Sequence, residues 1–522
     1  LTTTFLTIYA VKKIFEENNE NDKVSQLNGQ YLTNPYHNDK IKYKLKPLVS
    51  DDDVYKCIVE DRLEDIDNTN SNVYKNYIFI SSVLKELINK GFSANDILMA
   101  LDKLYVVSVP ISEEDNAQKI FESINSTGEK LTAADLIRNY LLMDLRSDVQ
   151  EQYYAKYWKK IEENVSQDSK ILEMFFRIYL SIKMYILVSK NSVYREFVDW
   201  VESQNLEIKD LFEDLVEYAK AYKELMCDDD VKDTFKNSVI DFRKINSDVP
   251  LGIVMEFYRL YKENEINDSV LNEIILAINS YMIRRSICDM NSQNISKLFP
   301  SALRKVKEKC SGDYSNVVKY LNQEIVGNNA NTSGSFMPTD KQMMEMLHSA
   351  SVYKRPALRI ILDRIELHNN PAPVDLSKLS VEHLMPQSPT DEWLAELDTD
   401  EETYLNNLHR LGNLTLASKP DNSRMGNLIW EYKNEVLKDT AHLTLNMELL
   451  DVDKWTIDKI ESRTISLIEK ICSIFPYPEV DVSSSKNDEI NTKTALEVSK
   501  EKLFKGNNFD QVKNQVIKCN NE

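Results

Sequence analysis

The sequence predicts a mainly helical protein with smaller α+β parts toward its two ends. Glycine is scarce, at 10 residues in 522, which favours long helices over sheets rich in hairpins. From about residue 150 to 325 the apolar residues recur at helical spacing. Short runs typical of strands lie outside that stretch, at residues 104–111, around Glu382 and at 414–416. We therefore expect an α+β N-terminal region, a helical middle and a strand–strand–helix C-terminal domain.

Length and composition bound the class of protein. A chain of 522 residues is too long for one ordinary hydrophobic core, so about two to four domains are expected. The fractions of apolar residues (42%) and charged residues (28%) are typical of a soluble globular protein. The net charge of −20 argues against attraction of the whole surface to nucleic acid, because phosphate binding depends on clustered Lys and Arg. An acidic nuclease remains possible if basic residues gather locally.

Several kinds of site and location are disfavoured. Neither GxxxxGK[ST] nor GxGxxG occurs, so no Gly-rich phosphate loop is expected. The six cysteines are far apart and form no CxxC pair, which fits the reducing cytoplasm and argues against a disulfide framework. The most apolar run, residues 171–188, contains Glu173, Arg177 and Lys183, so a buried helix is expected there rather than a membrane span. The N-terminus has neither Met nor a basic segment, and we expect it to lie within a domain rather than in a signal peptide.

The N-terminal region, residues 1–148, mixes predicted strands and helices. Residues 104–111 are rich in Val and Tyr and predict a buried strand. The apolar residues within 117–124 recur at i, i+3, i+4 and i+7 and predict a helix. A capping box at residues 132–135 is expected to open a second helix that ends near Leu145.

The rest of the chain divides into four parts. Residues 149–325 form the helical region, and the Gly- and Asn-rich residues 326–341 are the predicted linker. Residues 342–475 form another folded unit, which holds five of the six histidines. Residues 476–522 are polar and are expected to form a mobile tail.

The segment 380–387 carries most of the functional information. It places Glu382 beside His383 in a β-like run that Pro386 is expected to end. Adjacent residues of an ideal strand face opposite ways, so both side chains share one site only if the strand kinks or ends there. Cutting a phosphodiester needs an activated water and charge neutralisation, which an imidazole and a divalent cation supply. We therefore assign His383 as the general base and Glu382 as a ligand of Mg²⁺ or Mn²⁺.

Two asparagines and a lysine complete the predicted site. Asn413 precedes the second predicted strand and is expected to orient the imidazole by a hydrogen bond. Asn422 opens a predicted helix that runs to about Lys438, and its carboxamide oxygen is expected to complete the metal's protein ligands. Lys433 on the same helix is expected near the scissile phosphate.

Each of these residues also has a purely structural interpretation. A Glu-His pair on a strand is most often solvated or structural, and Gly-Asn before a strand is most often a turn or bulge. Asn422 is an ordinary helix N-cap residue, and Lys433 fits a solvated helix face. No single residue justifies a nuclease assignment. Their order and spacing together favour one.

The same residues resemble the C-terminal HNH-type (ββα-metal) nuclease domain of GmrSD-like restriction enzymes, over about residues 342–475. Trp455, Ile460 and Arg463 match the closing helix of that domain. The motif residues that carry the resemblance are Val381-Glu382-His383-Leu384-Met385-Pro386-Gln387, Leu411-Gly412-Asn413-Leu414-Thr415-Leu416, Asn422-Ser423, Asn427 and Lys433.

The N-terminal region is similar to the ParB-like, nucleotide-hydrolysing partner domain of the same family. The resemblance implies a nucleotide (NTP) site that includes Phe121, Asn125, Gly128, Asp135 and Arg138. The family's Asp-Gly-Gln-Gln-Arg motif is absent, since the chain starts with the residues that directly follow it. That motif is held to carry the nucleotide chemistry, so we expect no NTP hydrolysis by this chain alone.

A further run, residues 284–288 with its arginine pair, also looks like the family. The sequence assigns it no chemical role. Surface or interhelical ion pairs are the structural interpretation of these arginines and of Arg138.

The resemblance implies a metal-dependent DNA endonuclease of bacterial anti-phage defence. Such enzymes are typically regulated by nucleotide and cut modified phage DNA, for example DNA with glucosylated hydroxymethylcytosine or phosphorothioate. Mg²⁺ or Mn²⁺ is the expected cofactor, a homo-oligomer is possible, and no membrane association is expected. Two alternatives stay open: a catalytically incomplete remnant or scaffold that binds a partner or nucleic acid without cleavage, and an RNase of similar geometry.

Overall fold

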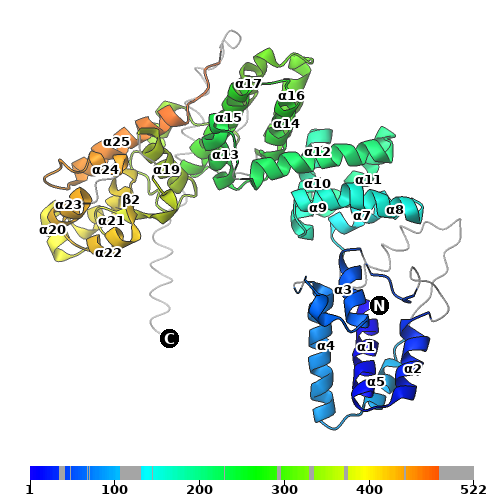
Figure 1. Cartoon of the computed structure of the whole chain (residues 1–522). Helices are drawn as coiled ribbons and strands as arrows, with labels where there is room; N and C mark the ends of the chain where they lie inside the picture. The colour runs from blue at the N-terminus through cyan, green and yellow to red at the C-terminus, as the bar shows by residue number, and fades with distance from the viewer. Residues whose placement is uncertain are drawn as a thin grey trace, which may run out of the picture. The chain divides into compact units, whose positions relative to one another are not determined.

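The computed structural model describes residues 1–34, 42–47, 49–67, 69, 71–105, 131–143, 145–228, 230–290, 295–327, 334–369, 374–439 and 443–480. The chain divides into two compact units, Leu1–Ala117 and Gln118–Glu522. The described residues are mainly helical, as predicted, and carry one two-stranded sheet (Figure 1).

The first unit is a small helical assembly built around α1 (Thr2–Glu17). Helix α1 contacts α2 (Asn21–Leu27), α4 (Asn72–Asn89) and α5 (Ala94–Leu101). Helix α3 (Val49–Val59) packs on α4 and adds residues to the same hydrophobic core. Two short turns of helix complete the unit, η1 (Asn28–Leu32) and η2 (Leu63–Asp65). The predicted α+β character does not appear in the described part, whose only β-type contact is a single bridge between Thr33 and Tyr43.

Two predicted elements of the N-terminal region lie at or beyond the edge of the described residues. Leu104 and Tyr105 are described and belong to no strand, while 106–111 lie outside the described residues. The predicted helix at 117–124 lies outside them as well.

The second unit begins with a helical region, residues 131–327, that is helical throughout its described part, as predicted. Its elements are α7 (Ala133–Met143), α8 (Ser147–Tyr153), η3 (Tyr154–Trp158), α9 (Lys159–Asn164), α10 (Ser169–Met184), η4 (Lys190–Ser192), α11 (Val193–Gln204), α12 (Ile208–Met226), α13 (Asp233–Ile245), α14 (Leu251–Lys262), α15 (Asp268–Ile287), η5 (Ile295–Lys297), α16 (Leu298–Cys310), η6 (Tyr314–Asn316) and α17 (Val317–Gly327).

The predicted capping box is confirmed at the start of α7. The Asp135 amide donates to Thr132 Oγ1 over 3.3 Å, and the Thr132 amide donates to Asp135 Oδ2 over 3.3 Å. The helix ends at Met143, two residues before the expected Leu145. Because α7 packs on α10 and α11, residues 131–143 belong with the helical region, whereas the sequence suggested a boundary near residue 148.

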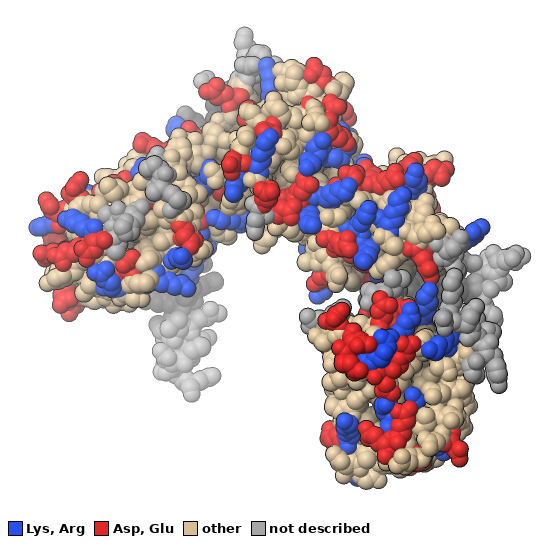
Figure 2. Space-filling model, viewed as in Figure 1, with Lys and Arg blue, Asp and Glu red and all other residues tan. Residues whose placement is uncertain are grey.

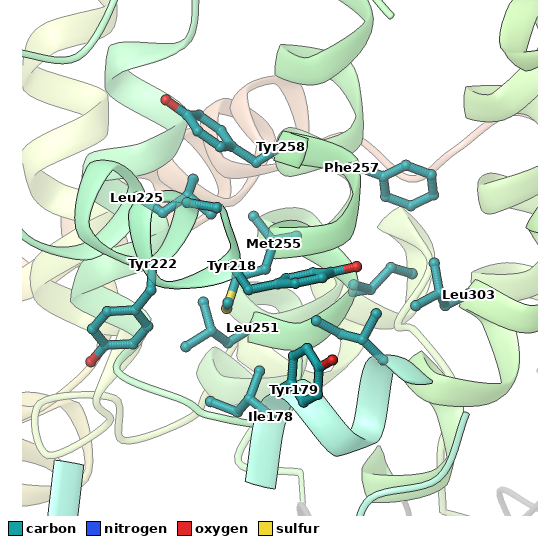
Figure 3. Packing of buried hydrophobic residues seen from close by; sticks show 14 of the residues in the cluster. Ile178, Tyr179, Tyr218, Tyr222, Leu225, Leu251, Met255, Phe257, Tyr258 and Leu303 are labelled. Atoms are coloured by element: carbon teal, nitrogen blue, oxygen red, sulfur yellow. The ribbon is translucent and has the colours of Figure 1, made fainter. Parts of the chain in front are cut away.

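The core of the helical region is rich in interlocking aromatic rings. Figure 3 shows Tyr179 of α10 and Tyr218 of α12 lying among aliphatic side chains from α14 and α16. Their ring centroids are 5.3 Å apart in an edge-to-face arrangement. The apolar run 171–188 lies mostly in α10, which ends at Met184 and buries Leu172, Phe175 and Phe176, among others. No helix of the described part is long and apolar enough to span a membrane.

The C-terminal domain, residues 340–475, surrounds the small sheet with short helices. Its elements are α18 (Asp340–Leu347), α19 (Ala357–Asn369), η8 (Leu376–Lys378), β1 (Leu379–His383), α20 (Asp391–Leu397), α21 (Glu401–Leu408), η9 (Leu411–Asn413), β2 (Leu414–Ser418), α22 (Lys419–Met425), α23 (Trp430–Asp439), α24 (Thr444–Met447) and α25 (Ile457–Ile474).

Helix α15 belongs to two hydrophobic cores. Its first half packs in the core of the helical region, whereas Ile283 and Ile287 lie at 0% exposure in a core formed with α18, α19, β2 and α25. Most residues of α15 from Leu271 onward are buried, and the polar Arg284 and Arg285 are among them. The helical region and the C-terminal domain are thus joined through shared packing.

The predicted linker, residues 326–341, is described only in part, since residues 328–333 lie outside the described residues. Residues 326–327 end α17 and residues 340–341 begin α18. The segment between, residues 334–339 (the strap), is held by Tyr281, Arg284 and Arg285 of α15. Arg285 donates to the carbonyl oxygens of Gly334 (2.9 Å) and Phe336 (2.6 Å), and Arg284 donates to that of Pro338 (2.9 Å). The strap is therefore fixed to α15. The ion pairs expected for the two arginines are confirmed in part. Arg284 Nη2 lies 2.6 Å from Asp340 Oδ1 of α18, whereas the bonds from Arg285 to Gly334 and Phe336 go to carbonyl oxygens.

The start of the predicted tail also packs against the protein. Tyr477 and Val480 contact the core of the helical region, and the Arg284 guanidinium lies 5.8 Å from the centre of the Tyr477 ring. Residues 481–522 lie outside the described part.

Candidate functional site

The sheet places Glu382 and His383 at the end of β1. Strands β1 and β2 are antiparallel, with Glu382 opposite Thr415 and His383 opposite Leu414. β1 ends at His383, as the following Pro386 predicted. Helix α22 packs against both strands, which completes the predicted strand–strand–helix unit.

Glu382 forms a buried ion pair with Lys433 of α23. Lys433 Nζ lies 3.0 Å from Glu382 Oε1 and donates a second hydrogen bond, of 2.8 Å, to the carbonyl oxygen of His383. Burial raises the pKa of the Glu382 carboxyl and lowers that of the Lys433 ammonium, while their mutual attraction opposes both shifts. The Lys433 side chain is 0% exposed, so the expected position beside a scissile phosphate is wrong. Its role in the structure is to hold Glu382 and the end of β1.

The His383 imidazole is enclosed by two other rings. Its Nε2 lies 3.0 Å from Nδ1 of His409, and its ring meets Tyr353 edge-on with centroids 4.4 Å apart. Burial lowers the pKa of His383 to about 3, helped by His409 and the Lys433 charge, so the ring is neutral at pH 7. Burial also lowers the pKa of His409.

Asn413 fastens the segment that follows β1. Its Oδ1 accepts hydrogen bonds from the Met385 amide (2.7 Å) and from Trp455 Nε1 (3.2 Å), and its Nδ2 donates to the carbonyls of Met385 (3.0 Å) and Leu408 (2.8 Å). These four bonds occupy the carboxamide. The predicted hydrogen bond from Asn413 to the His383 imidazole is therefore wrong. The hydrogen-bond partner of that ring is His409.

Asn422 lies inside α22 and does not open a long helix. The N-cap is Ser418, whose hydroxyl oxygen accepts from the Asp421 amide over 3.2 Å. Gly426, at φ +38°, separates α22 from α23, so the single helix expected from Asn422 to Lys438 is two helices.

Asn422 nevertheless shares a face of the sheet with Glu382. Its Nδ2 donates to Ser380 Oγ over 3.2 Å. Ser380 and Glu382 are two residues apart on β1 and so point to the same side. The amide oxygen of Asn422, the atom that a hard cation prefers, is not used in this bond.

Comparison with known families decides the assignment. The model of the GmrSD restriction endonuclease N-terminal domain matches residues 1–142, and the model of the GmrSD restriction endonucleases C-terminal domain matches residues 337–470. The two matches together cover more than half of the 522 residues, and the second contains both strands and α22. The chain belongs to the GmrSD restriction endonuclease family. Membership of this family makes the chain an endonuclease, a hydrolase whose substrate is DNA. A search of the curated proteins finds no match.

The residues of the predicted nucleotide site fall into two groups in this GmrSD chain. Phe121, Asn125 and Gly128 lie outside the described residues. Asp135 caps α7, and its Oδ1 lies 3.2 Å from Arg138 Nη2. Arg138 and Asp135 thus have structural partners within α7, in line with the structural interpretation of this arginine.

The donor atoms of the GmrSD site fit one kind of cation. Within the described ranges no three His, Cys, Asp or Glu side chains are placed to hold a metal ion together. One carboxylate (Glu382) and one carboxamide oxygen (Asn422) on the same face suit Mg²⁺ or Mn²⁺, which keeps most of its ligands as water or phosphate oxygens.

Sequence reasoning missed His409 and Tyr353. Their rings stack with centroids 5.2 Å apart and planes 9° apart, and both contact the His383 ring. A histidine four residues before Asn413 was visible in the sequence, but nothing in its spacing showed that it meets His383.

The surface charge follows the acidic composition. Figure 2 shows Lys and Arg interspersed with Asp and Glu over the face in view, rather than gathered in one basic field.

Proposed function

We propose that the chain is a metal-dependent DNA endonuclease of the HNH (ββα-metal) type, with His383 as general base and with Glu382 and Asn422 holding Mg²⁺ or Mn²⁺. The observation that carries the proposal is the arrangement of β1, β2 and α22. It puts two oxygen donors on one face and a neutral imidazole at the end of the same strand.

The His383 ring performs the proton transfer. Its Nδ1 takes a proton from water while the water oxygen forms a bond to phosphorus in line with the leaving oxygen. The phosphorus–leaving-oxygen bond breaks, and the leaving oxygen departs as an oxyanion that takes a proton from solvent. Nε2 is already hydrogen-bonded to His409, so Nδ1 is the ring nitrogen that accepts the water proton. A DNA phosphate beside the ring adds negative charge and raises the pKa of His383 from about 3 toward the working range.

Four other side chains organise the reaction. Lys433 fixes the Glu382 carboxylate, and Asn413 fixes the backbone just after β1. Glu382 and Asn422 would hold a divalent cation, which would supply Lewis-acid stabilisation of the charge on the phosphoryl oxygens. The biological setting that we propose is modification-dependent restriction of phage DNA, which the restriction function of the family supports.

Cleavage assays test the proposal. The purified chain is incubated with plasmid and with modified phage DNA, with Mg²⁺, with Mn²⁺ or with a chelator. We expect nicking that needs the metal and falls at least about 100-fold in His383→Ala, the order of one general base. His368→Ala, on an exposed position at the end of α19, is the matched control and should cut like the parent.

The same assays separate the alternatives. Equal cutting by the parent and His383→Ala contradicts the general-base assignment. DNA binding without cutting by either protein favours the scaffold, and preferential cutting of RNA favours the RNase.

A further inference from the structure

We propose that His409 is the positioning residue of His383: it accepts a hydrogen bond from His383 Nε2 and so fixes the tautomer whose lone pair lies on Nδ1. The inference rests on the proposed function of His383 and assigns to the site a residue that the nuclease signature does not contain.

The first argument is the proton between the two rings. His383 Nε2 and His409 Nδ1 are 3.0 Å apart, a hydrogen-bond distance that requires one proton between them. In its neutral form each ring carries a single N–H. Either His383 donates from Nε2, or His409 donates from Nδ1.

The second argument is the tautomer that each arrangement requires. The Nε2–H form is the commoner neutral tautomer of histidine in water. Donation by His383 Nε2 to His409 Nδ1 lets both rings keep this form. The reverse direction requires both rings to adopt the less common form and leaves His383 with a hydrogen on Nδ1, where it has no lone pair for a water proton. The first arrangement is therefore favoured on both rings at once.

The third argument is that His409 is itself held in place. Tyr353 stacks on the His409 ring and meets the His383 ring edge-on, so the three rings limit each other's rotation. The carbonyl oxygen of His409 accepts a hydrogen bond of 2.9 Å from the amide of Val352, the residue before Tyr353. The stacking partner and the backbone partner thus come from one segment, which sets the position of His409 Nδ1.

The contact also acts when His383 becomes charged. Once Nδ1 has taken the water proton, His383 donates from Nε2 as an imidazolium, and a charge-assisted hydrogen bond is stronger than a neutral one. His409 keeps its own proton and stays neutral. The hydrogen bond therefore keeps its direction, and the ring keeps its orientation, through the proton transfer.

Paired substitutions of His409 test the role in catalysis. His409→Leu removes the acceptor, whereas His409→Asn places an amide oxygen near the former Nδ1. We expect kcat to fall about 10- to 100-fold in His409→Leu with little change in KM for DNA, and to recover in large part in His409→Asn. Equal losses in both variants, or a loss that appears only in KM, would overturn the proposal.

A spectroscopic test works without metal or DNA. In the metal-free parent protein labelled with ¹⁵N-histidine, His383 Nδ1 should show the chemical shift of a nitrogen with a lone pair, and Nε2 that of an N–H. The chain has only six histidines, so single substitutions assign the signals. In His409→Leu the His383 signals should move toward a mixture of tautomers.

The two experiments distinguish the possible failures. A proton on His383 Nδ1 in the parent overturns the positioning role, whatever the cleavage assays give. If His383→Ala cuts normally, the proposed function fails, and the tautomer measurement still decides whether His409 orders the ring. If His409→Leu does not fold, the parent spectrum and His409→Asn give the answer.

Discussion

At the scale of single residues, the buried ammonium of Lys433 holds the Glu382 side chain and the end of β1 in place. It is 0% exposed and joins Glu382 to the backbone at the end of β1. Lys433→Met removes this cation and leaves a carboxylate buried without a partner. We expect the free energy of unfolding to fall by about 3 kcal/mol.

Urea denaturation followed by tryptophan fluorescence measures this loss, because Trp393, Trp430 and Trp455 are fully buried in the C-terminal domain. Lys438→Met, on an exposed position of the same helix, is the control and should change the free energy by less than about 0.5 kcal/mol. Similar effects of the two substitutions would contradict the structural role of Lys433.

A second residue, Asp241 of α13, makes stability depend on pH. Burial raises the pKa of its carboxyl to about 7, Arg364 and Lys244 oppose the shift, and Asp363 adds to it. The folded chain therefore holds a proton that the unfolded chain releases near pH 4. This contribution to stability is complete below about pH 4 and is lost as the pH rises to about 7.

Asp241→Asn should make the pH dependence between 4 and 7 flatter, because Asn cannot titrate. Urea denaturation of both proteins across this range measures the difference in slope. Parallel curves for parent and variant would show that Asp241 keeps an ordinary pKa.

The chemistry of the site residues was visible in the sequence, but their partners were not. Glu382 and His383 lie at the end of β1, as the local strand pattern predicted, whereas Asn422 lies inside α22 rather than at its start. Asn413 and Lys433 were given the wrong partners, because Met385 and Glu382 are reached through tertiary contacts that a periodic pattern does not reveal. His409 was missed for the same reason.

At the scale of elements, η9 lies so close to α25 that only glycine fits at position 412. A Cβ at this position would lie 2.0 Å from the carbonyl oxygen of Ile460 and 2.7 Å from Thr464 Oγ1. The backbone of α25 cannot yield cheaply, so Gly412→Ala should lower the free energy of unfolding by about 3 kcal/mol. Gly29→Ala is the control, since nothing lies within 4 Å of its added Cβ.

Urea denaturation of both glycine variants provides the comparison. If Gly412→Ala is as stable as Gly29→Ala, η9 and α25 do not approach as closely as described.

Helix boundaries show where sequence patterns succeed and fail. The capping box at Thr132 was predicted correctly because both of its bonds are local. The break at Gly426 was missed because apolar residues continue at helical spacing on both sides of it. Periodicity records which positions are buried, and two short helices that pack on the same core give nearly the same record as one long helix.

At the scale of the whole molecule, the residues matched by the C-terminal family model are not a complete core. The core around β2 and α25 includes Ile283 and Ile287 from α15, far upstream of residue 337. A fragment of residues 337–480 should therefore expose an apolar surface and lack a cooperative thermal transition, whereas residues 131–480 should melt cooperatively.

Circular dichroism on heating distinguishes the two fragments. Cooperative melting of the shorter fragment would show that α15 is dispensable for the C-terminal domain. The sequence predicted the helical region and the folded unit after it, yet not their shared core. The predicted boundary followed Gly and Asn content, while Arg284 and Arg285 carry the connection through backbone carbonyls.

The strap on α15 has a consequence for where the enzyme would cut. A nuclease domain on a flexible linker can cut at many distances from a DNA segment that another domain binds, so its products vary in length. Here two guanidinium groups and a common helix remove that freedom within the second unit. If the helical region binds DNA, the cut should fall at a nearly constant number of base pairs from the bound segment. Substitution of Arg284 and Arg285 should make that number more variable.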